Sequence, residues 1–72
     1  MENVLEQFRK NHGLSYGALA LAAGVSSRGS VYCHCQGRRR ISAEMAIRYS
    51  VRLSIPLYLI RPDLWPPPRD AA

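Results

Sequence analysis

Serine and glycine residues mark the starts and stops of short helices along the first half of this chain. Glycine readily adopts the left-handed backbone conformation that closes a helix, and Gly13, Gly24 and Gly37 recur at short intervals. Serines follow these glycines, and among them Ser15 and Ser42 stand where the next helix has to begin, which is a favoured capping position. This punctuation predicts an all-α fold of short helices.

The pattern predicts five helices followed by an extended, proline-rich tail. A first helix covers residues 2–10 and is stopped by residues 11–13, and a second runs from its cap at Ser15 to Gly24. A third runs from a cap at Ser26 or Ser27 to about Gln36, and a fourth follows Ser42. Residues 56–60 fit either one turn of helix, which we prefer, or a short strand. Three consecutive prolines, 66–68, exclude a regular helix. We therefore expect a domain over residues 1–66 and a disordered tail over residues 67–72.

The length of 72 residues allows one domain, close to the lower limit for a core that folds without a disulfide, a metal or a partner. With 47% apolar and 21% charged residues, the composition is that of a folded protein.

Cys33 and Cys35 are too close together for an ordinary structural disulfide. Neither a membrane span nor a secretion signal is recognisable, so we expect a cytoplasmic protein.

The net charge of +5 is concentrated in the middle of the chain. Residues 1–27 and residues 53–72 each contain two acidic and two basic side chains, whereas residues 28–52 contain six arginines against the single acid Glu44. Arg38, Arg39 and Arg40 are consecutive. Such a localised basic region indicates a polyanionic partner, for which double-stranded DNA is the obvious candidate.

The second and third predicted helices have the features of a helix-turn-helix. Small side chains such as Ala20 allow the helices to approach closely, and Gly24 allows the turn between them. Val31, with His34 or Cys35 one turn later, supplies the apolar surface that seats the third helix. The polar side chains on the outward side of that helix suit the major groove of DNA.

Three motifs resemble the Cro-like helix-turn-helix regulators of prophages, and within them the YdaS-like group. They are Leu19-Ala20-x-x-Ala23-Gly24-Val25-Ser26, Gly37-Arg38-Arg39-Arg40-Ile41-Ser42-Ala43-Glu44, and the run Leu-Ile-Arg-Pro-Asp-Leu-Trp-Pro over residues 59–66. The resemblance covers residues 14–66. It implies a five-helix Cro/repressor-like domain that binds operator DNA, commonly as a homodimer.

Candidate site residues follow from the chemistry of the side chains around the third helix. The residues expected to contact bases, because their side chains offer bidentate, hydroxyl or amide hydrogen bonds, are Ser27, Arg28, Ser30, Tyr32 and Gln36. Those expected to contact phosphates are Ser15, Arg38, Arg39 and Arg40. Leu57, Leu59, Ile60 and Trp65 are candidates for a dimer interface, and burial in the core of the monomer is the alternative for each of them.

These observations predict a sequence-specific DNA-binding regulator, namely a repressor that occupies its operator. Through DNA binding, such a protein would be associated with the nucleoid. The alternative is an antitoxin or protein-interaction module whose residues 57–65 or proline-rich tail bind a protein partner, with DNA binding secondary. No spacing of Ser, His and acidic residues suggests an enzyme, and no cofactor is expected. A metal at Cys33-His34-Cys35 would need a fourth ligand, for which only His12 is obvious, so no metal site is expected.

Overall fold

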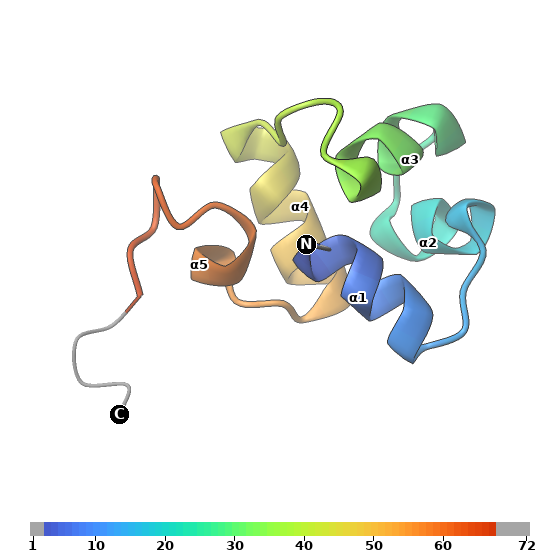
Figure 1. Cartoon of the computed structure of the whole chain (residues 1–72), viewed down its shortest axis with the longest axis horizontal. Coiled ribbons are helices and arrows are strands. Elements are labelled where there is room, and N and C mark those ends of the chain that lie inside the picture. Colours follow the sequence, from blue (N-terminus) through green and yellow to red (C-terminus); the bar gives the residue numbers. More distant parts are fainter. Residues whose placement is uncertain (1–2, 68–72) are drawn as a thin grey trace.

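The computed structural model describes residues 3–67, which form five helices and no strand (Figure 1). The helices are α1 (Val4–Asn11), α2 (Tyr16–Ala23), α3 (Arg28–Gln36), α4 (Ala43–Leu53) and α5 (Leu57–Ile60). The all-α prediction is confirmed, including the preference for a short helix over a strand after Pro56. Of the helix expected over residues 2–10, Glu2 lies outside the described residues, as do residues 68–72 of the expected tail.

Local side chains start the first four helices. The side-chain oxygens of Asn3, Ser15, Ser27 and Ser42 each accept a hydrogen bond from the backbone N–H three residues later, at 2.9 to 3.2 Å. Of the two serines that could begin the third helix, Ser27 is therefore the cap. Gly24 and Gly37 close α2 and α3 with φ values of +71° and +73°, as their sequence positions predict.

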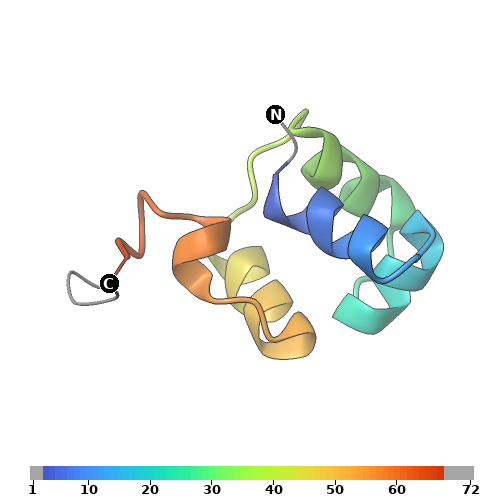
Figure 2. The same cartoon turned by 60° about the horizontal axis from the view of Figure 1, so that its bottom comes forward.

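The core lies where α2 meets α3 and α4, and α1 and α5 close it from the other side (Figure 1). Figure 2 shows α1 lying along α3. The fully buried large side chains are Leu5, Leu19, Val31 and Tyr49. Ala23 and Ala46 are also completely buried, and their small size lets the helices approach closely.

Helix α4 has two adjoining apolar faces, and only one of them packs into this core. Ala46, Tyr49 and Leu53 are buried, whereas Ile47 and Val51 are 47% and 74% exposed. The segment after α5 turns back so that Trp65 packs against the core while remaining partly exposed. None of the helices formed by residues 3–67 has the length and apolar character that crossing a membrane requires.

Candidate nucleic-acid interface

The turn between α2 and α3 fixes the angle at which these two helices meet. The backbone N–H of Val25 donates to the carbonyl of Ala20 at 2.9 Å, and the left-handed Gly24 lets the chain reverse. Val31, His34 and Cys35 face the core and are at least 96% buried. The prediction that Val31 and one of its neighbours a turn later seat α3 is confirmed, and both His34 and Cys35 take part.

Arg28, Gly29, Tyr32 and Gln36 form a continuous exposed stripe on another side of α3. The ring of Tyr32 lies edge-on to the ring of Tyr16 in α2, with 5.0 Å between their centroids. Val31, His34 and Cys35 are buried and Ser30 and Cys33 are partly buried, so this stripe is the most exposed part of α3.

Side chains from three elements extend the stripe into a wider surface. The stem of Arg28 passes beside Gly17 in α2, where a Cβ atom would lie 3.5 Å from Arg28 Cδ. The guanidinium carbon of Arg38, just beyond α3, lies 5.8 Å from the centre of the Tyr32 ring. Ser15 caps the same end of α2 and is exposed. We call the surface formed by Ser15, Tyr16, Arg28, Tyr32 and Arg38 the aromatic-basic surface.

Gln36, which is expected to contact a base, is exposed, but its amide nitrogen forms hydrogen bonds within the protein. Its amide nitrogen donates to Glu6 Oε2 and to the Tyr16 hydroxyl, both at 2.9 Å. Tyr16 also donates to Glu6 Oε2 at 2.9 Å, and Arg9 Nε donates to Glu6 Oε1 at 2.6 Å. This Glu6 cluster joins α1 to α2 and α3, so the amide nitrogen of Gln36 is directed towards α1.

The hydrogen bond from Arg9 is the main reason why the pKa of Glu6 lies below its ordinary value, and the bonds from Tyr16 and Gln36 add to this effect. Burial of the carboxyl acts in the opposite direction. The sequence does not predict the Glu6 cluster. The spacing of Glu6 and Arg9 signals their ion pair, but no local signal connects them to Tyr16 or Gln36.

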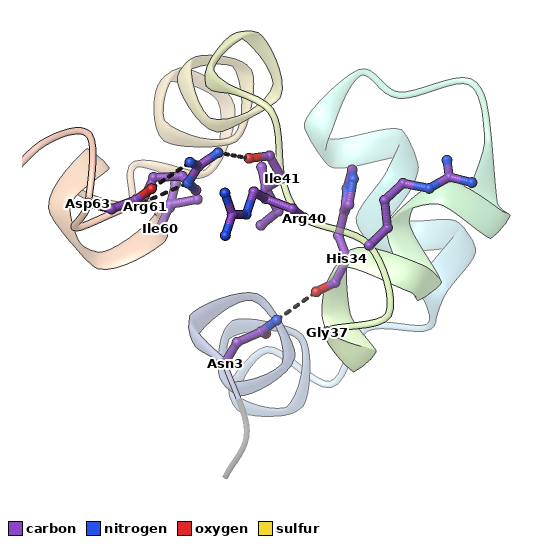
Figure 3. A pocket seen from close by; sticks show the side chains of 9 residues that line it. Asn3, His34, Gly37, Arg40, Ile41, Ile60, Arg61 and Asp63 are labelled. Atoms are coloured by element: carbon purple, nitrogen blue, oxygen red, sulfur yellow. Dashed lines mark hydrogen bonds and ion pairs between the residues drawn. The ribbon is translucent and has the colours of Figure 1, made fainter.

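The loop after α3 is fastened at both of its ends. Asn3 Nδ2 donates to the carbonyl of His34 at 2.6 Å, and the guanidinium of Arg61 donates to the carbonyl of Ile41 (Figure 3). Asp63 holds that guanidinium through two hydrogen bonds, of 2.9 and 2.6 Å. The pKa of the Asp63 carboxyl is therefore lowered to about 2, mainly by Arg61 and to a smaller extent by Arg40.

The three consecutive arginines do not form one row, although all of them are exposed. Arg38 belongs to the aromatic-basic surface, whereas Arg40 points into a pocket of about 410 Å³ beside Ile60 and Arg61 (Figure 3). Arg39 lines this pocket and also a second hollow, of about 400 Å³, between α3 and α4. The predicted phosphate-contacting arginines thus face more than one direction.

Ser30 lies on a different side of α3 from the predicted base-contacting residues Arg28 and Tyr32. It is partly buried and lines the hollow between α3 and α4, together with its cap partner Ser27. The structure therefore divides the five expected base-contacting residues. Arg28 and Tyr32 share the exposed stripe, Ser27 and Ser30 line the hollow, and Gln36 belongs to the Glu6 cluster.

The expected dimer-interface residues are also divided. Ile60 is only 8% exposed and belongs to the core of the monomer, which is the alternative that the sequence leaves open to the dimer interface. Leu57 and Trp65 are partly buried against the same core, and Leu59 is 49% exposed. Exposed Leu64, at 46%, lies next to Trp65 in the chain.

His34 and the two cysteines form no metal centre with other residues of the described chain. His34 Nδ1 shares a hydrogen bond of 2.8 Å with the Tyr49 hydroxyl, and its burial, assisted by the charge of Arg39, lowers its pKa. Burial raises the pKa of the Cys35 thiol to about 11. Within residues 3–67, no three His, Cys, Asp or Glu side chains are grouped so that they could hold a metal ion.

In comparisons with known proteins, no family model matches this chain, and neither does any curated protein or solved structure.

Proposed function

We propose that this chain is a Cro-like, sequence-specific DNA-binding regulator in which α2 and α3 act as a helix-turn-helix. The observation that carries this proposal is the aromatic-basic surface, where the exposed stripe of α3 continues into the capped end of α2 and into Arg38. A convex helix face bordered by arginines complements the major groove and the phosphates along its edges.

The roles of the residues follow from where they lie. Arg28 and Tyr32 would read base edges, Arg28 through its two-pronged guanidinium and Tyr32 through its hydroxyl. Ser15, with its helix end, and Arg38 would contact phosphates on the two sides of α3. A chain that binds an operator in this way would repress transcription by excluding polymerase, and a homodimer would read two half-sites about one helical turn apart.

Selection of bound sequences from a random pool of double-stranded DNA tests this function. Gel shifts at several salt concentrations then compare the affinity of the chain for the selected DNA with its affinity for an unrelated sequence. We expect Arg28→Ala to reduce the preference for the selected sequence, and Arg38→Ala to weaken binding to both DNAs and to lower the slope of log K against log salt by about 0.9.

Arg52→Ala provides the control, because Arg52 is an exposed arginine of α4 that lies outside the aromatic-basic surface. We expect it to change both affinities less than Arg38→Ala does. Failure of the wild-type chain to prefer any sequence at physiological salt would overturn the proposal of specific binding.

The exposed apolar side chains Leu59 and Leu64 favour a second candidate function, as a protein-interaction module of the antitoxin kind. Such a module would bind a toxin or another protein through α5 and the segment after it. The paired substitution Leu59→Ser and Leu64→Ser should abolish capture of the product of a neighbouring toxin gene while leaving DNA binding intact. Unchanged capture by this variant would rule out that segment as the binding surface.

A further inference from the structure

The hollow between α3 and α4 has a lining that is basic and rich in hydroxyl groups. Its volume is about 400 Å³, and its polar lining includes Ser27, Ser30, Arg39, Arg40, Ser42 and Arg48. Among residues 3–67, no carboxylate lines it. We call it the α3–α4 hollow. Since an unopposed group of arginines attracts anions and repels cations, its composition selects a negatively charged ligand.

Two of the serines retain a hydrogen to donate into the hollow. Ser27 Oγ accepts from the backbone N–H of Ser30, and Ser42 Oγ accepts from that of Met45, each at 3.2 Å. Both capping bonds use a lone pair of the oxygen, so the O–H of each serine remains available to donate to a ligand. Several hydroxyl donors beside guanidinium groups match an oxyanion with several acceptor oxygens, such as phosphate.

Arg39 and Arg48 are the principal cations of the α3–α4 hollow, because the guanidinium of Arg40 points into the other pocket, beside Arg61 (Figure 3). Arg48 comes from α4 and Arg39 from the loop, so the two approach the hollow from different elements. Arg52, one turn further along α4, does not line the hollow, and its guanidinium lies beside Gly24.

We propose that the α3–α4 hollow is a phosphate-binding site in which Arg39 and Arg48 pair with the anion and the hydroxyls of Ser27, Ser30 and Ser42 donate to it. Resting on the proposed function, we assign this phosphate to the backbone of the DNA whose major groove α3 enters. The site gives α4 a direct part in DNA binding through Arg48. Ser30 then contacts the DNA backbone and not a base.

The first experiment measures the site without DNA. The ¹⁵N-labelled full chain is titrated with inorganic phosphate at constant ionic strength, with chloride as the balancing anion, while amide resonances are followed by NMR. We expect phosphate to shift the amides of Ser27, Ser30 and Ser42. Arg48→Ala should weaken this binding about tenfold, which corresponds to the loss of one charge-assisted hydrogen bond, whereas Arg52→Ala should leave it nearly unchanged.

The second experiment identifies the source of the phosphate. Gel shifts on the selected DNA compare the wild-type chain with Arg48→Ala and Arg52→Ala over a range of salt, and single backbone phosphates are replaced by neutral methylphosphonates. If the DNA backbone occupies the site, Arg48→Ala lowers the salt slope by about 0.9. A methylphosphonate at one position should then weaken DNA binding by the wild-type chain and have no effect on binding by Arg48→Ala.

The outcomes separate this inference from the proposed function. In one outcome, the chain binds no DNA but shows phosphate-specific shifts that Arg48→Ala removes. This would support the site, identify free phosphate as its ligand and overturn the proposed function. Strong DNA binding that Arg48→Ala and Arg52→Ala reduce equally, with no phosphate-specific shifts, would overturn the inference and leave the proposed function intact. Circular dichroism spectra of both variants verify that each is folded.

Discussion

Gln36 Nε2 lies 2.9 Å from Glu6 Oε2, so the last residue of α3 is tied to the first turns of α1. The two residues are 30 positions apart in the chain, and Glu6 is 93% buried. This contact holds the end of the helix that carries the aromatic-basic surface. We expect this contact to orient α3, whereas the sequence alone predicts that Gln36 reads a base.

Substitution of Gln36 by alanine distinguishes these two roles. We expect Gln36→Ala to lower the free energy of unfolding by about 1 kcal/mol, because it removes a hydrogen bond to the buried carboxylate of Glu6. DNA affinity should fall to a similar extent for all sequences. Chemical unfolding and gel shifts measure the two effects, and Gln7→Ala, at an exposed position on α1, is the control. A change in sequence preference would return Gln36 to the base-reading surface.

The bond between His34 and Tyr49 joins α3 to α4 in the core, and a single oxygen can be removed to test it. Tyr49→Phe should lower the free energy of unfolding by about 1–3 kcal/mol, because it leaves a buried ring nitrogen without a partner. Tyr58→Phe serves as the matched control at a half-buried position on α5, and we expect a change within about 0.5 kcal/mol. Equal effects of the two substitutions would contradict this account.

Burial of His34 makes stability depend on pH. Its pKa is lower in the folded chain than its ordinary value of 6.5, so the unfolded chain takes up a proton more readily. The stability that neutral His34 contributes is therefore fully present above pH 6.5, and it is lost as the pH falls through the pKa of His34 in the folded chain. Urea unfolding at a series of pH values should show this loss in the wild-type chain and in the exposed-site control His12→Gln, whereas His34→Asn should flatten it. An unchanged profile in His34→Asn would assign the loss to another group.

The two glycines that close α2 and α3 allow backbone strain to be separated from contact. Gly37→Ala should cost about 1 kcal/mol of unfolding free energy, because an L residue is strained at φ +73° while open space surrounds its Cβ. Gly24→Ala has the same strain, and its Cβ also meets Arg52 Nε at 3.4 Å. We expect thermal or urea unfolding to give an equal or greater loss for Gly24→Ala. A smaller loss for Gly24→Ala would contradict this account, because the added methyl group would then gain stability from its contact with Arg52.

Arg61 is expected to control both the loop that carries the arginines and the ionisation of Asp63. Arg61→Ala removes the main cause of the low pKa of Asp63, so that pKa should rise from about 2 towards its ordinary value of 3.8. NMR titration of the carboxyl carbon measures this rise. Arg40→Ala should give a smaller rise, because Arg40 contributes least among the causes. A larger rise in Arg40→Ala would show that Asp63 pairs mainly with the loop.

Local signals in the sequence determined where the helices lie. A capping serine and a closing glycine act on backbone groups within four residues of themselves, so Ser15, Ser42, Gly24 and Gly37 could be assigned without knowledge of the fold. The side of α3 that enters the core was equally accessible, because Val31 and the residues a turn later recur at helical spacing. Even so, the choice between Ser26 and Ser27 as the cap of α3 required the geometry of the turn.

Only the tertiary structure decided which partner each polar side chain of α3 meets. Gln36 turns towards Glu6, and Ser30 lines the α3–α4 hollow together with Arg48, because α1 and α4 lie on those sides of the helix. Packing also determined that Ile60 fills the core while Leu59, its neighbour, stays exposed. Such contacts join residues far apart in the sequence, and helical periodicity specifies the direction of a side chain but not the element that it will meet there.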